Sequence, residues 1–174
     1  MRAIRFICCL LIYVAATAPA YADGPDGVLG VWTTADGKAR VEIVKQGDIY
    51  GGSIVWLKEP VYPAGNKQGT PGQPKVDLNN PDKAQQSRPI MGLPLIQGFK
   101  YAGDDVWSDG TIYDPDSGKL YSCKLTLMMD GTLRVRGYVG ISLFGRTEIW
   151  TRYASESTPT DRKSTRLNSS HGII

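Results

Sequence analysis

Short stretches of alternating hydrophobic and polar residues run along most of the chain between residues 29 and 153. The clearest is 119–128, where every second side chain from Tyr121 to Leu127 is apolar and those between are polar. A period of two is typical of a β-strand with one buried face. This pattern predicts eight strands, over residues 29–35, 38–46, 48–57, 95–102, 106–114, 119–128, 132–140 and 146–153.

Turn signals separate these stretches. Asp36-Gly37 and Asp130-Gly131 are hairpin signals, because glycine tolerates the positive φ that two-residue turns require. Connections this short join antiparallel neighbours. The sequence therefore predicts an all-β fold, an antiparallel eight-stranded meander that closes into a barrel and so removes exposed edges. A barrel of eight strands is either filled by side chains or holds one small ligand, and the pattern leaves both possibilities open.

The longest interruption of the pattern is residues 58–94, a proline-rich crossover. Because proline cannot donate to a strand ladder, this segment cannot form a central strand. Asn80, Pro81 and Asp82 resemble an N-cap, a first helical position and a first-turn acid, which predicts one short helix over 81–87. The segment is either an ordered surface connection or a functional lid or recognition loop. It contains seven of the eleven prolines: Pro60, Pro63, Pro71, Pro74, Pro81, Pro89 and Pro94.

The N-terminus has the organisation of a cleavable signal peptide. Arg2 and Arg5 precede an apolar run over 6–18, and Ala20-Tyr21-Ala22 supplies small residues at the cleavage site. The run has about 13 residues, whereas a membrane-spanning helix needs about 20. We expect residues 1–22 to be removed after Ala22, so that the mature protein is periplasmic or secreted and lacks a stable membrane anchor. The alternatives are an uncleaved anchor or a buried helix.

The C-terminal residues 161–171 read Asp-Arg-Lys-Ser-Thr-Arg-Leu-Asn-Ser-Ser-His, which resembles a translated short-read sequencing adapter. We therefore expect residues 161–174 to be a non-native tail and residues 23–160 to form a single domain; the alternative is a genuine basic tail. The whole chain has 20 basic and 17 acidic residues, a net charge of +3. Without residues 1–22 and the tail, 15 basic and 16 acidic residues remain, so no charge excess favours nucleic acid as a partner.

The same trimming limits the available chemistry. The single histidine, His171, lies in the tail, so the expected mature domain cannot form a Ser-His-Asp triad or a histidine-ligated metal site. Of three cysteines only Cys123 remains, which excludes an internal disulfide and a cysteine-rich zinc site. Cys123 is an inert buried thiol or, alternatively, a nucleophile. We expect no metal and no cofactor.

Two short motifs lie at the ends of the predicted meander. Gly30-Val31-Trp32 opens the first strand, and Trp150-Thr151-Arg152 lies on the last. The pair resembles the lipocalin arrangement, in which an arginine packs over the tryptophan of a Gly-x-Trp motif and closes one barrel end. A guanidinium above an indole gains cation–π attraction. Trp32, Trp150 and Arg152 are therefore assigned a structural role, and the expected barrel is lipocalin-like.

Two groups of residues are candidates for ligand binding. The first group is aromatic, because aromatic side chains are the usual lining of ligand pockets. It comprises Trp56, Trp107, Tyr113 and Tyr121, with Phe99, and packing in the core explains these residues equally well. Polar side chains crowd the crossover at Asp77, Asn80 and Arg88. They bind a ligand, or they hold the loop together through a cap and an arginine–carboxylate pair.

The mature domain resembles the bacterial secreted family known as domain of unknown function 2147. The resemblance implies a small exported barrel and no activity. The matching stretches span residues 30–152 in order: Gly30-Val31-Trp32, Gly52-Ser53-Ile54-Val55-Trp56-Leu57, Asp77 with Asn80-Pro81, Arg88-Pro89-Ile90-Met91-Gly92-Leu93, Gly110-Thr111-Ile112-Tyr113-Asp114-Pro115, Ser117-Gly118-Lys119, Tyr121, Gly137-Tyr138 and Trp150-Thr151-Arg152.

Three functions are consistent with these features. The first is a barrel that binds a small hydrophobic molecule near the crossover, and the second is a structural or protein-interaction module of the cell envelope. The third is a hydrolase or isomerase that works without histidine. Nucleophile-elbow and phosphate-loop signatures are missing from the sequence, so a non-enzymatic function is favoured.

Overall fold

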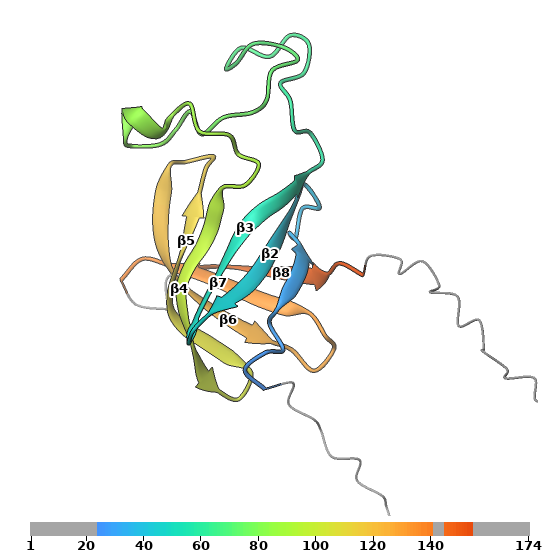
Figure 1. Ribbon diagram of the computed structural model, residues 1–174, viewed down its shortest axis with the longest axis vertical. Coiled ribbons are helices and arrows are strands. Elements are labelled where there is room, and N and C mark those ends of the chain that lie inside the picture. The colour runs from blue at the N-terminus through green and yellow to red at the C-terminus, as the bar shows by residue number, and fades with distance from the viewer. Residues whose placement is uncertain (1–23, 141–144, 155–174) are drawn as a thin grey trace, which may run out of the picture.

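The computed structural model describes residues 24–140 and 145–154, and the expected signal peptide and tail lie outside them. Eight antiparallel strands, each paired with its neighbour in sequence, form a closed barrel (Figure 1). The predicted all-β meander is confirmed, with strand ends within two residues of those expected. The strands are β1 Gly30–Thr33, β2 Ala39–Gln46, β3 Ile49–Leu57, β4 Pro94–Gly103, β5 Val106–Asp114, β6 Lys119–Leu127, β7 Leu133–Tyr138 and β8 Gly145–Arg152.

The crossover between β3 and β4 stands at one end of the barrel, opposite the end where the described chain begins (Figure 1). It holds one 3₁₀ turn, η1 Lys83–Gln85, so the expected helix over 81–87 is wrong in extent. The cap is also different, because Asp82 accepts from the backbone N–H of Ala84. Asn80 is not available as the cap, since its side chain donates to Asp77 and accepts from the Asp82 N–H.

Side chains fill the interior of the barrel. Trp32, Trp107 and Trp150 are each at most 1 % exposed. Trp107 packs against Tyr50 with its ring edge-on, at 6.1 Å between ring centroids. Apolar burial at about 25 cal/mol per Å² is the main force that stabilises such a core. The buried cluster comprises Val28, Trp32, Val41, Ile43, Tyr50, Ile54, Leu93, Leu95, Ile96, Phe99, Trp107, Cys123, Leu125, Leu127, Leu133, Val135 and Trp150.

The barrel closes through a short seam between β1 and β8. Only Trp32↔Arg152 and Thr33↔Thr151 are paired there, because β1 has four residues. One further backbone hydrogen bond, from Tyr153 N–H to the Val31 carbonyl at 2.8 Å, extends the seam.

Side-chain contacts at this end of the barrel support the seam. The Arg152 guanidinium lies 4.3 Å from the centre of the Trp32 ring. It also donates to the carbonyls of Leu29 and Gly27, at 2.8 and 2.6 Å. The Trp32 indole N–H donates in turn to the Val28 carbonyl at 2.8 Å. Arg152 thus ties the last strand to the segment that covers this end of the barrel.

A second arginine supports the seam from outside. Arg40 lies between two aromatic rings, 4.3 Å from the centre of Trp56 and 3.6 Å from that of Tyr153. A register shift between Arg40 and Val41 pairs Arg40 with Trp56, while Val41 pairs with Ile54 in the core. The shift turns Trp56 out of the interior, so it does not join the buried cluster.

We expect Arg152→Ala to lower the free energy of unfolding by about 1–2 kcal/mol, because it removes a cation–π contact and two hydrogen bonds to carbonyls. Urea unfolding followed by tryptophan fluorescence measures the change. Lys100→Ala, at an exposed position of β4, is the control and should stay within about 0.5 kcal/mol of wild type. Equal stability of the two variants would show that the seam does not depend on Arg152.

Candidate functional site

The crossover is an ordered arm that leaves the barrel and returns to it. One bridge, Val61↔Pro74, closes a loop in its first half, and a second, Val76↔Pro89, closes a loop in its second half. At its base the Gly92 N–H donates to the Ile54 carbonyl of β3 at 2.8 Å, and the Ile54 N–H donates to Leu93. These backbone bonds replace the strand ladder that the prolines prevent.

A buried carboxylate lies at the centre of the arm. Asp77 is fully buried and accepts three side-chain hydrogen bonds. Asn80 donates at 2.7 Å, Arg88 forms an ion pair at 3.0 Å, and the Tyr113 hydroxyl of β5 donates at 2.8 Å. Since Tyr113 belongs to the barrel, Asp77 holds the arm to the barrel wall. A buried charge must be paired and hydrogen-bonded in this way.

The same contacts determine how Tyr113 behaves. Burial, and then the hydrogen bond to the Asp77 carboxylate, raise the pKa of Tyr113 to about 12. Tyr113 therefore stays protonated at neutral pH and acts as a donor. The Asp77 carboxylate accepts from three protein groups, and these contacts hold the crossover to the barrel.

A second contact fixes the turn between β5 and β6 to the arm. The Asn79 side chain donates to the carbonyls of Pro115 and Asp116, at 3.1 and 3.0 Å. Gly118, with φ of +68°, lies against the Asn79 backbone, where a larger side chain would collide. The sequence did not predict this role of Asn79, because its partners are distant backbone carbonyls.

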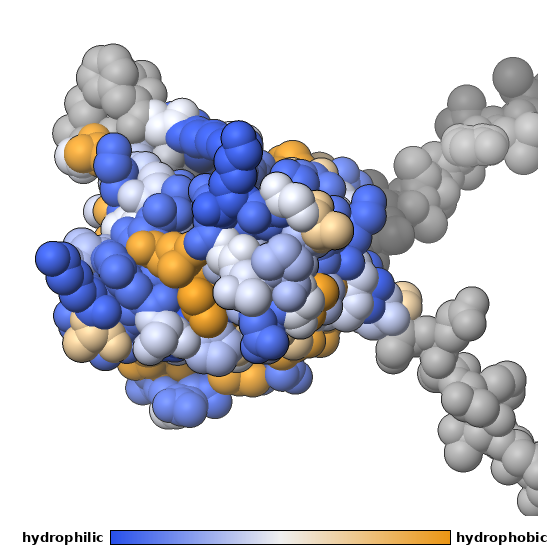
Figure 2. Space-filling model, turned by 90° about the horizontal axis from the view of Figure 1, so that it is seen from above, coloured by the Kyte–Doolittle hydropathy of each residue, from blue (hydrophilic) through white to orange (hydrophobic). Residues whose placement is uncertain are grey.

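The arm also forms a surface hollow of about 400 Å³. Val76 N–H donates to the Tyr62 hydroxyl at 3.2 Å, which fixes the ring that forms one wall. Figure 2 looks onto this end of the molecule and shows apolar side chains set among hydrophilic ones. None of the lining residues carries a charge: they are Tyr62, Gly69, Thr70, Gln73, Pro74, Val76, Leu78 and Pro89.

The predicted site residues do not gather in this hollow. Trp107 is in the core, and Tyr121 is half-buried on β6. Trp56 stacks on Arg40 outside the barrel. Tyr62 and the prolines of the hollow were missed as site residues, although the proline density of the crossover was the available signal.

Two further groups bear on the chemistry. Burial raises the pKa of Cys123 to about 12, so its thiol stays protonated at neutral pH. Within the described part of the chain, no three His, Cys, Asp or Glu side chains gather as metal ligands would. In residues 24–140 and 145–154, no helix has the length and apolar character needed to cross a membrane.

Comparison with known proteins agrees with this architecture. Residues 30–152 match the profile of a family described as "Uncharacterized protein conserved in bacteria (DUF2147)". The chain belongs to this family. Among solved structures it is similar to protein HP1028 from Helicobacter pylori, described as belonging to the lipocalin family. That match has a TM-score of 0.60 and 19 % identity and covers 74 % of this chain and 84 % of the other, so it shows the lipocalin-like fold. Curated protein sequences gave no match.

The Tyr113–Asp77 hydrogen bond predicts a pH effect. The pKa of Tyr113 is raised from 10.0 to about 12 on folding, so its stabilising contribution is present below pH 10 and is lost toward pH 12. At neutral pH we expect Tyr113→Phe to be less stable than wild type by about 1 kcal/mol. Urea unfolding between pH 9 and 12 should show this gap closing. The Cys123 thiol also titrates in this pH range, but it does so in both proteins and cancels from the difference between them. A difference in stability that stays constant would therefore contradict the assignment to Tyr113.

Proposed function

We propose that this protein is a binding protein for a small, uncharged, largely apolar molecule, and that the molecule lies in the hollow of the crossover. The observation that carries the proposal is the hollow itself, about 400 Å³ and lined by uncharged side chains on an arm fixed to the barrel. Concave, mostly apolar sites with a few polar groups are typical of small-molecule binding.

The packing of the barrel supports a site outside it. Lipocalin-like barrels hold a ligand where the interior is not filled by side chains. Here Trp32, Trp107, Trp150, Tyr50 and Phe99 are at most 1 % exposed and belong to one packed cluster. A ligand would have to displace these rings, whereas the hollow requires no such rearrangement.

The lining of the hollow supports the chemical class of the ligand. Val76, Leu78 and the two prolines offer apolar contact, and a charged ligand would find no charge of opposite sign among the lining residues. The Tyr62 hydroxyl accepts from Val76, which leaves its proton free to bind a polar atom of the ligand. Gln73 and Thr70 add polar groups for orientation.

The crossover is already ordered without a ligand, which favours tight binding of the proposed ligand. Because Asp77, Asn79 and the backbone bonds at Gly92 already fix the crossover, binding does not have to order it. A preformed site of this kind retains the free energy that a flexible loop would lose on binding.

The test uses the neutral dye N-phenyl-1-naphthylamine and the mature protein. We expect the dye to bind with increased fluorescence and Leu78→Glu to weaken it about tenfold, because the new carboxylate would be desolvated beside an apolar ligand. Leu120→Glu is the matched control: Leu120 is an exposed leucine on β6 outside the hollow, and its change should leave the affinity unaltered.

Two results would contradict the proposal. One is equal binding of the dye to wild type and Leu78→Glu, which would place the dye elsewhere. The other is chemical-shift change on dye binding at the buried tryptophans and none at Tyr62, which would move the ligand into the barrel.

We also propose that the protein acts after export to the periplasm or beyond. The support is the charged, apolar and small-residue order of residues 1–22. Expression of the full chain in a bacterial host, followed by N-terminal sequencing of the protein from the periplasmic fraction, should give a mature chain that starts at Asp23. Intact Met1 in the cytoplasmic fraction would contradict export.

A further inference from the structure

Strand β8 is paired along one side only for most of its length. Its residues from Gly145 to Trp150 pair with β7 in an unbroken register. On the other side β1 reaches only Arg152 and Thr151. No strand in the described part of the chain pairs with the stretch 145–149 on that side, which we call the β8 edge.

The backbone groups of the β8 edge can be assigned from the neighbouring bonds. Tyr153 N–H donates to the Val31 carbonyl, so odd-numbered residues of this strand direct their N–H and C=O groups toward β1. The pairing of β8 with β7 has no bulge, so the same alternation holds along the rest of the strand. The odd-numbered residues of the edge are Ile149, Thr147 and Gly145. Their backbone groups therefore face the open side, and no backbone hydrogen bond from a described residue reaches them there.

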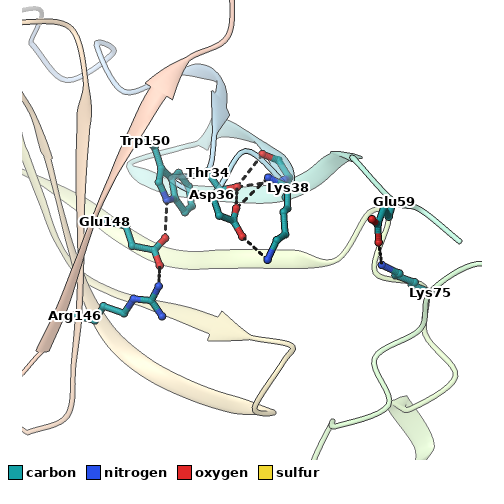
Figure 3. Close-up of polar contacts among 9 residues, drawn as sticks. Thr34, Asp36, Lys38, Glu59, Lys75, Arg146, Glu148 and Trp150 are labelled. Atoms are coloured by element: carbon teal, nitrogen blue, oxygen red, sulfur yellow. Dashed lines mark hydrogen bonds and ion pairs between the residues drawn. The ribbon is translucent and has the colours of Figure 1, made fainter. Parts of the chain in front are cut away.

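Charged side chains limit what can pair with this edge. Arg146 and Glu148 lie on the same face as Trp150, and Figure 3 shows them joined in a row. Glu148 forms an ion pair with Arg146 at 3.2 Å and accepts from the Trp150 indole N–H at 3.2 Å. Charged side chains usually protect a strand edge, because an arriving strand leaves them unmatched.

We propose that the β8 edge pairs with the same edge of a second copy of this chain, antiparallel and centred on Thr147. In this register Arg146 lies opposite Glu148 of the second copy and Glu148 lies opposite its Arg146. The charge pattern is complementary to itself, so it admits the second copy while it excludes other strands.

The outer face of the pair fits the same register. Ile149 is 44 % exposed, and it comes to lie opposite Gly145 of the second copy. Gly145 cannot carry a side chain, because a Cβ there would collide with the carbonyl of Gly137. The glycine leaves room for the isoleucine, so the pair buries an apolar side chain that the single chain exposes. Twofold symmetry makes each of these contacts twice.

The inference goes beyond small-molecule binding and stands independently of it, since the hollow lies on the crossover and the edge on β8. Sedimentation velocity of the mature protein over a concentration series measures the dimer directly. We expect a reversible dimer, and Arg146→Glu should weaken it at least about tenfold, because like charges then lie opposite each other. The double variant Arg146→Glu, Glu148→Arg should restore it.

Two further variants provide a second test of the edge and a control. Thr147→Pro removes a backbone N–H that faces the open side, so it should abolish the dimer while the monomer keeps its strand signal by circular dichroism. Lys124→Glu makes the same charge reversal at an exposed site on β6 and should leave the dimer intact. A wild-type monomer up to about 1 mM would overturn the proposal. So would a dimer that Arg146→Glu and Thr147→Pro leave unchanged, or one that the double exchange fails to restore.

Discussion

Closure of the barrel depends on the contact between Arg152 and Trp32, because the strands that meet there share very little backbone. A four-residue β1 leaves only two paired residues on β8. The guanidinium above the indole links the last strand to the first, and its bonds to Gly27 and Leu29 add the covering segment. Without closure the packed core would face solvent along this seam. The outer stack of Arg40 between Trp56 and Tyr153 supports the same junction from the other side of the wall.

The Asp77 carboxylate plays a corresponding part for the crossover. One buried charge accepts from two residues of the arm and from Tyr113 of β5, so the arm and the barrel share a hydrogen-bond network. A proline-rich segment has few backbone donors of its own, and this side-chain network supplies the order that a strand ladder would otherwise give. The hollow exists because the arm is held in one shape.

Local pattern was enough to predict the barrel. Alternation in 119–128 and the Asp-Gly turns determine strands, neighbours and faces, because each depends on residues close in sequence. The Arg88–Asp77 pair was one of two alternatives that the sequence left open for these side chains, since both lie within one loop. The outward turn of Trp56 was not, because it follows from a register shift against Arg40. The hollow around Tyr62 and the clamp by Asn79 were missed because they need segments that only the folded chain brings together.

The filled core separates the residues that stabilise the barrel from those that line the surface hollow. In a barrel that carries its ligand inside, every change of specificity alters the residues that stabilise the fold. Here the lining of the hollow shares no residue with the buried cluster. Under the proposed function, exchange of Thr70, Gln73 or Leu78 would therefore change the ligand without altering any residue of the buried cluster.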